Sequence, residues 1–207
     1  MKYDKNLQAF VSILDADLSI GKNHLVDDLP ETFTAPDFLY FFALRDQFWA
    51  DMTEKEQIEV SAAMTECYLS ALLHISSGDY TFTEENHHLE HCILYGDLLS
   101  GAFSGKLIEL DKTALLKEWL LLLQRINKEL LTYSLEERST SEKKVCLVTR
   151  LVEALTKTKN VEAMVADAKA VLCDNIWPES SALPHDFLAD VAGKRMTSAL
   201  DLQSMRE

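Results

Sequence analysis

The chain has 207 residues, of which 47% are hydrophobic, and it carries a formal net charge of −14. This length and apolar content suffice for one sizeable core, so we expect a single helical domain over residues 1–207. Nucleic acid and anionic lipid both bind clustered Lys and Arg, so a surface this negative disfavours them, and no partner of either kind is expected.

Apolar residues recur with a helical period along nearly the whole chain, and no segment alternates convincingly as a strand does. We therefore predict an all-α fold, a helical bundle. The first helix covers about residues 4–18, and a loop with Pro30 follows over 21–35. Pro36 suits the first turn of the next helix, which runs through the aromatic residues of 38–48.

Three pairs of residues have the spacing of a capping box, in which a Ser or Thr and a Glu three positions later cap the first turn of a helix. Thr53 with Glu56 predicts a helix that ends near residue 76. Thr81 with Glu84 predicts one over about 85–110, and Ser139 with Glu142 predicts one that ends near residue 157. Single residues predict three more helix starts. We expect one helix from Asp111 to about Tyr133, a second from Asn160 to about Asn175, and a third from Pro184 to about Leu200.

No apolar run approaches the roughly 18 residues of a membrane span, and the N-terminal stretch lacks the apolar centre of a signal peptide. A cytoplasmic protein without a membrane span is therefore expected. The four cysteines form no C-x-x-C pair, so reduced, buried thiols are expected rather than disulfides or a metal site. They are Cys67, Cys92, Cys146 and Cys173.

Two stretches, Met64–Ile75 and Leu115–Leu123, are apolar nearly all the way round the predicted helix. Such a helix lies either at the centre of a bundle or against a partner, and both interpretations stay open for each.

Small residues also recur every four positions, as Gly96, Ser100 and Ser104 and again as Gly101 and Gly105. A glycine inside a helix costs about 1 kcal/mol, so close helix packing is expected there, either within the chain or against a second subunit.

The segment Gly96-Asp97-Leu98-Leu99-Ser100-Gly101-Ala102-Phe103 resembles a helix of the trans-prenyl diphosphate synthases, where it follows the first Asp-rich motif. Within that family the chain resembles component I, the small accessory subunit of two-component heptaprenyl and hexaprenyl diphosphate synthases. The likeness extends over about residues 38–195. It includes Ala62-Ala63-Met64 in an early long helix, Ile126-Asn127-Lys128-Glu129, and a helical region over Leu183–Arg195. The resemblance implies a degenerate isoprenoid synthase fold.

Allylic diphosphate chemistry needs clustered carboxylates that hold Mg²⁺ on one helix face. Before the Gly-Asp segment the chain offers only acids spread over a predicted turn, namely Asp79, Glu84 and Glu85. The acidic run Asp27–Glu31 contains Pro30, which indicates a loop, and the pair Asp186 and Asp190 has no basic neighbour. We therefore predict no catalytic residue and no metal site in this chain.

The resemblance then implies an accessory subunit of a heterodimeric medium- or long-chain synthase that serves menaquinone biosynthesis. A catalytic subunit with Asp-rich motifs would be the partner and would bind Mg²⁺ and substrates. Leu99 and Phe103 are predicted to lie near the wall that sets product length, and Asp97 to be a structural hydrogen-bonding residue. The predicted interface or wall residues are Gly96, Asp97, Leu99, Ser100, Gly101, Phe103 and Ser104.

Two other functions remain open. His87 and His91, or His88 and His91, have the helical spacing of zinc ligands, so the chain could be a metal-dependent hydrolase or a divergent, self-sufficient synthase. Alternatively, it could be a helical adaptor with no link to isoprenoids.

Overall fold

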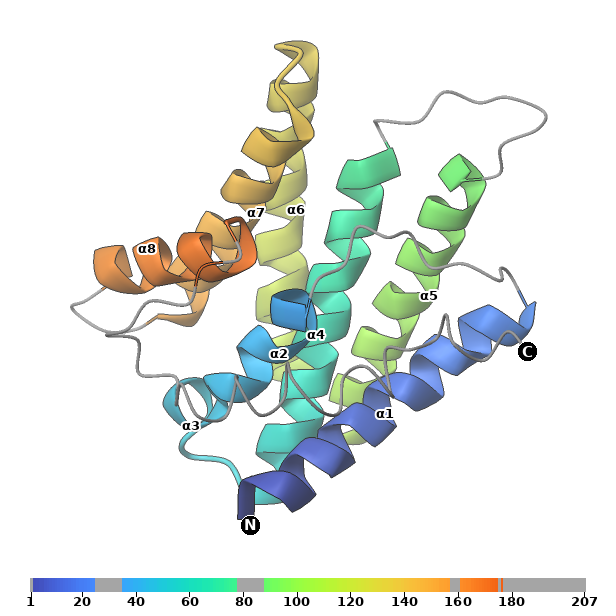
Figure 1. The fold of residues 1–207 in the computed structure, drawn as a ribbon, viewed down its shortest axis with the longest axis vertical. Coiled ribbons are helices and arrows are strands. Elements are labelled where there is room, and N and C mark those ends of the chain that lie inside the picture. The colour runs from blue at the N-terminus through green and yellow to red at the C-terminus, as the bar shows by residue number, and fades with distance from the viewer. Residues whose placement is uncertain (1, 25–34, 78–87, 157–160, 175, 177–207) are drawn as a thin grey trace.

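All regular structure in the described part of this computed structural model is helical, which confirms the predicted fold class. Residues 2–24, 35–77, 88–156, 161–174 and 176 are described. The helices are α1 (Lys2–His24), α2 (Ala35–Ala43), α3 (Arg45–Phe48), α4 (Glu54–Ser76), α5 (His88–Glu109), α6 (Thr113–Leu135), α7 (Thr140–Leu155) and α8 (Val161–Leu172). Figure 1 shows their arrangement.

Helix α4 begins where its capping box predicts. The Thr53 hydroxyl accepts a hydrogen bond from the Glu56 backbone N–H at 3.3 Å, and the Glu56 carboxylate accepts one from the Thr53 backbone N–H at 2.9 Å. Ser139 and Glu142 make the same reciprocal pair at the start of α7. Both boxes satisfy N–H groups that a helix start otherwise leaves without partners.

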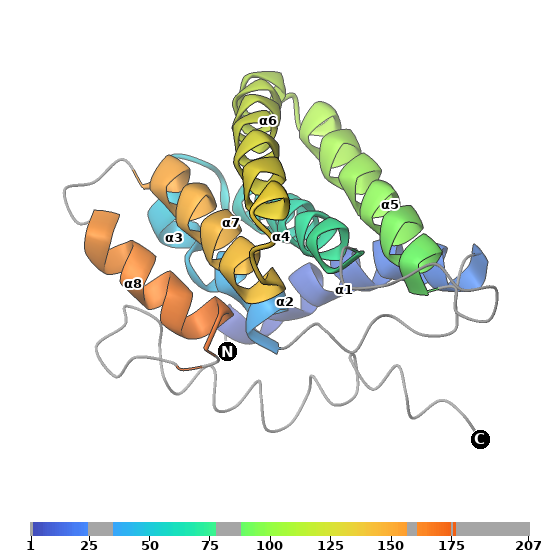
Figure 2. The ribbon, with the colours of Figure 1, turned by 90° about the horizontal axis from the view of Figure 1, so that it is seen from above.

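Helix α4 lies at the centre of the bundle, with α1, α2, α5 and α7 packed around it (Figures 1 and 2). Nearly every residue from Gln57 to Ser76 is buried, including both sides of the Met64–Ile75 stretch. The interpretation as a central helix is therefore correct for α4.

The aromatic segment forms two helices instead of the single one predicted. Pro36 does lie in the first turn of α2, as expected, but the helix ends at Ala43 and α3 restarts at Arg45. The Arg45 guanidinium donates a hydrogen bond to the Phe42 carbonyl at 2.9 Å and lies 4.3 Å from the centre of the Phe42 ring. Arg45 thus supplies a donor for a carbonyl at the end of α2, where helices leave such groups unpaired.

Asp111 ends α5 instead of capping α6, so that prediction is wrong. Its φ is 54°, a left-handed conformation that Asp tolerates better than most residues. The next residue, Lys112, donates its backbone N–H back to the Leu107 carbonyl at 2.8 Å, which closes the end of α5. Lys112 is the residue before α6, and no side-chain cap bond forms there.

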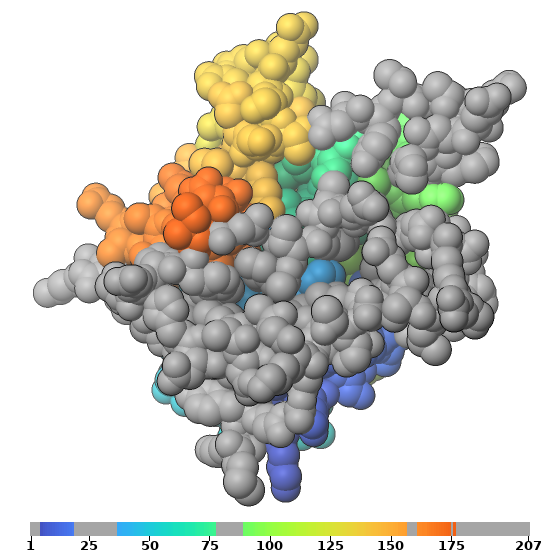
Figure 3. All heavy atoms as spheres, viewed as in Figure 1, coloured from blue at the N-terminus to red at the C-terminus, as the bar shows by residue number. Residues whose placement is uncertain are grey.

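Helices α6 and α7 form a hairpin that projects from the body of the molecule (Figures 1 and 3). Its turn uses a second left-handed residue, Glu137, with φ 57°. The Arg138 backbone N–H donates to the Tyr133 carbonyl at 2.9 Å, so the end of α6 is closed in the same way as the end of α5.

Several predicted features lie outside the described residues, among them the Thr81 box, Asn160 and the Pro184 helix. Within the described part, α1 is longer than predicted, and α7 and α8 end two to three residues earlier. Cys67, Cys92 and Cys146 are buried free thiols as expected, while Cys173 is partly exposed. None of the described helices combines the length and the apolar character that crossing a bilayer requires.

Candidate functional site

The inner face of α5 packs along α4 and belongs to the core. Tyr95, Leu99, Phe103 and Leu107 are fully buried and follow one another every four residues, as residues on one helical face do. The Phe103 ring lies 6.4 Å from the Trp119 ring of α6. The two residues predicted for a chain-length wall are therefore buried in this chain's own core, and their role in setting product length stays a prediction.

Gly96 lies where α5 approaches α4 most closely among the glycines described. The Ser70 hydroxyl of α4 donates to the Gly96 carbonyl at 2.7 Å, and a Cβ on Gly96 would lie 2.7 Å from His74 Nε2. At this position the small residue serves packing within the chain.

The outer face of α5 carries the other two glycines of the segment. A Cβ added at Gly101 or Gly105 would have no neighbour within 4 Å. Leu94 and Ile108 share this face and are 45% and 58% exposed. Together with Leu98, these two residues and the two glycines are spaced by four, three, four and three residues along the helix. This is the spacing of residues that face a second helix. Leu94, Leu98, Gly101, Gly105 and Ile108 are called the outer stripe below.

Asp97, Ser100 and Ser104 lie toward one edge of α5. Asp97 is mostly exposed, and its Oδ1 lies 3.5 Å from His74 Nε2. The Ser104 hydroxyl donates to the Ser100 carbonyl at 2.9 Å, a bond within the helix. Asp97 thus contacts a polar group of α4, as a structural role would require.

Ser100 opens onto a groove of about 460 Å³ between α4, α5 and α6. The α4 side contributes mainly small side chains, and the α6 side contributes larger apolar ones. No Asp or Glu is among the described residues that line it. The lining residues are Cys67, Ser70, Ala71, His74, Ile75, Ser77, Ser100, Leu123, Asn127, Leu130, Leu131, Ser134 and Lys143. This space is called the α4–α6 groove below.

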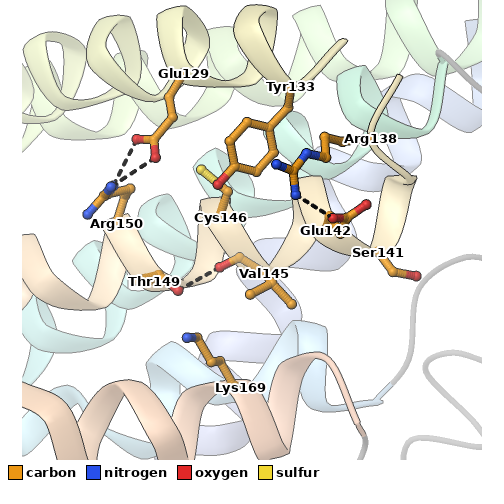
Figure 4. Close-up of a pocket in the computed structure, with 10 residues that line it drawn as sticks. All are labelled: Glu129, Tyr133, Arg138, Ser141, Glu142, Val145, Cys146, Thr149, Arg150 and Lys169. Atoms are coloured by element: carbon orange, nitrogen blue, oxygen red, sulfur yellow. Dashed lines mark hydrogen bonds and ion pairs between the residues drawn. The ribbon is translucent and has the colours of Figure 1, made fainter. Parts of the chain in front are cut away.

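A second cavity, of about 420 Å³, lies among α6, α7 and α8 (Figure 4). Arg150 holds both carboxylate oxygens of Glu129 at 2.9 and 2.8 Å, and Arg138 holds Glu142 at 2.9 Å. Each guanidinium is thus neutralised by a neighbour. Burial and then the nearby Glu129 raise the pKa of the Cys146 thiol to about 11, so this thiol is a poor nucleophile at neutral pH.

Among the described residues, no three His, Cys, Asp or Glu side chains converge as metal ligands. His87 and the side chain of His88 lie outside the description, as do Asp79, Glu84, Glu85, the 27–31 run, Asp186 and Asp190. The predictions about metal binding at these positions therefore stay predictions.

The sequence reading missed one buried charge cluster, formed by Asp17 of α1, Glu66 of α4 and Lys106 of α5. Lys106 Nζ lies 2.7 Å from Glu66 Oε1 and also pairs with Asp17. Glu66 Oε2 has no donor among the described residues. Burial, and next the Asp17 carboxyl, raise the pKa of Glu66 to about 8, against the opposing effect of Lys106. The sequence signal for this cluster was a single acid, Glu66, inside the mainly apolar stretch Met64–Ile75.

In comparisons with known protein families, with curated proteins and with solved structures, the chain matches none of them.

Proposed function

We propose that this protein is the accessory, non-catalytic subunit of a heterodimeric medium- or long-chain trans-prenyl diphosphate synthase. The outer stripe carries the proposal. It lies on the helix with the resemblance to those synthases, and Leu94 and Ile108 are exposed on either side of two glycines at which an added Cβ would meet no neighbour. A partner helix that covers this stripe gains about 25 cal/mol for each Å² of apolar surface removed from water.

Helix α6 supports the same idea. Leu120 and Leu121 are 48% and 46% exposed, and Leu131 and Leu135 are 62% and 79% exposed. Exposed leucines on two consecutive helices are typical of a surface that meets another protein.

In the proposed complex the partner supplies the Asp-rich motifs, Mg²⁺ and the bound diphosphates, and this chain supplies an apolar surface beside the growing prenyl chain. The product would serve as a quinone side chain, in menaquinone biosynthesis, and both subunits would work in the cytoplasm.

Reconstitution tests the proposal. The purified chain, mixed with a candidate partner that carries D-D-x-x-D motifs, is expected to restore prenyl diphosphate synthesis that neither protein shows alone. Synthesis by this chain alone with Mg²⁺ would reject a non-catalytic role.

A matched pair of variants tests the surface. Gly101→Leu adds bulk to the outer stripe, where there is room for the fold to accept it, and is expected to weaken the complex at least tenfold. Ala163→Leu, on an exposed position of α8, is the control and should leave binding unchanged. Equal affinities for the two variants would remove the outer stripe from the interface.

A further inference from the structure

The α4–α6 groove is hollow because its two long walls differ in side-chain size. Ser70 and Ala71 on α4 and Ser77 just after it are small, and they line the groove opposite leucines of α6, namely Leu123, Leu130 and Leu131. Helices α4 and α6 make little direct contact with each other. Leu131 remains 62% exposed at the edge of this space. The groove is therefore a trough between helices, with leucines along its α6 wall and several polar side chains elsewhere in its lining.

The basic side chains of the groove contrast with the acidity of the chain. The chain has 34 Asp and Glu against 20 Lys and Arg, yet no carboxylate is among the described residues that line the groove. Lys143 of α7 lies at the wall and makes no ion pair within the described residues. His74 adds a second basic side chain, with Asp97 beside it but not in the lining. A lysine with no partner among the described residues, beside a wall of leucines, is suited to a carboxylate on an amphipathic ligand.

We infer that the α4–α6 groove binds one amphipathic helix of a partner protein, which packs apolar side chains on Leu123, Leu130 and Leu131 and pairs a carboxylate with Lys143. A helix suits the trough because its walls are helices and its small residues leave room for bulky side chains. The Asn127 amide on the same wall offers hydrogen bonds to a polar edge of that helix. The inference rests on the proposed function only for the identity of the partner, which would be the catalytic subunit.

The first experiment measures the complex of the full chain with that catalytic subunit. Lys143→Glu reverses the charge at the groove, and Asn127→Trp fills it from an exposed position of α6. Both are expected to weaken the complex at least tenfold. Lys5→Glu on α1 and Ala166→Trp on α8, both at exposed positions outside the groove lining, are the controls and should bind as the wild type does.

The second experiment does not need the catalytic subunit. Two synthetic 18-residue helical peptides share a Leu- and Phe-rich face, and their polar positions are Glu in one and Lys in the other. Fluorescence anisotropy with the purified chain should show binding of the Glu peptide only. Asn127→Trp and Lys143→Glu should each reduce that binding at least tenfold, while circular dichroism verifies that the variants fold.

The two experiments fail in different ways. A complex that is unaffected by both groove variants, or a Glu peptide that binds no better than the Lys peptide, overturns the groove inference and leaves the proposed function standing. Peptide binding without any complex with an Asp-rich partner overturns the proposed function and supports the groove. Binding of a dansyl fatty acid that Asn127→Trp blocks, with no peptide binding, or a homodimer that Asn127→Trp dissociates, would also overturn a partner helix as the occupant.

Discussion

Helices α4 and α6 are both 23 residues long and both contain a strongly apolar stretch, yet their surroundings differ completely. Helix α4 is buried on all sides by its neighbours, whereas only Trp119 and Ile126 are buried on α6. Apolar composition therefore identifies helices that need to be covered, but it does not say by what. In α4 the cover comes from this chain, and in α6 the described structure leaves half of the surface open.

The largest expected effect is a difference in the free energy of unfolding between a leucine substitution on α4 and one on α6. Leu69 of α4 is fully buried, so Leu69→Ala should lower the free energy of unfolding by about 2–5 kcal/mol. Leu121 of α6 is 46% exposed, so Leu121→Ala should change it by less than about 0.5 kcal/mol. Urea denaturation followed by circular dichroism measures both. Equal losses would mean that α6 is as well packed as α4.

The buried acid of α4 should give the next largest effect. The pKa of Glu66 is raised from 4.5 to about 8, so the folded chain holds this proton more tightly than the unfolded chain. The stability this provides is complete below pH 4.5 and is lost as the pH rises through 8. Glu66→Gln, which does not titrate, should therefore be more stable than the wild type at pH 9, by an amount on the order of a few kcal/mol. Unfolding measured from pH 5 to 9 tests this, and parallel curves for the two proteins would contradict it.

The two faces of α5 should respond differently to the same substitution. Gly101→Ala meets open space and improves helix propensity, so it should stabilise the chain by about 0.5–1 kcal/mol. Gly96→Ala must displace the His74 ring, which should cancel part or all of that gain. Melting temperatures of the two variants provide the test. A larger gain for Gly96→Ala would reverse the assignment of inner and outer faces.

The smallest effect concerns the ion pair that joins the starts of α4 and α6. Lys112 Nζ lies 2.5 Å from Glu56 Oε1, and the hydrogen bonds from Lys112 and then Thr53 lower the pKa of Glu56 to about 2. Because this pKa is depressed, the stabilisation is present above pH 4.5 and fades as the pH falls through 2. Lys112→Met should move the pKa of Glu56 back toward 4.5 in an NMR titration. An unmoved value would mean that Thr53 alone holds the carboxylate.

Local signals were sufficient for features that depend on a few neighbouring residues. Thr53 with Glu56 and Ser139 with Glu142 mark true helix starts because each capping box is completed within four residues. The prediction for Asp111 also used only neighbouring residues, and it was wrong. An Asp before a helix resembles a cap, but Asp111 ends the previous helix in a left-handed conformation. A side chain that suits both positions does not reveal which one it occupies.

The candidate site depends on contacts between segments far apart in the chain, which a sequence pattern does not contain. Both sets of small residues on α5 predicted close packing, and the structure shows that Gly96 packs on α4 while Gly101 faces outward. The α4–α6 groove also needs α7 to bring Lys143 beside α4. The isoprenoid synthase fold and the function that the resemblance implies stay predictions.

The close pairing of α4 with α5 has a consequence for the order in which the chain gains structure. These helices are neighbours in the sequence and share the most extensive helix–helix packing described. Contacts between nearby segments close short loops, so we expect the α4–α5 hairpin to dominate the folding nucleus. The pairing of α2 with α8 joins residues more than one hundred positions apart and should form late. Kinetic φ-values near 1 for Leu73 and near 0 for Val171 would establish this order.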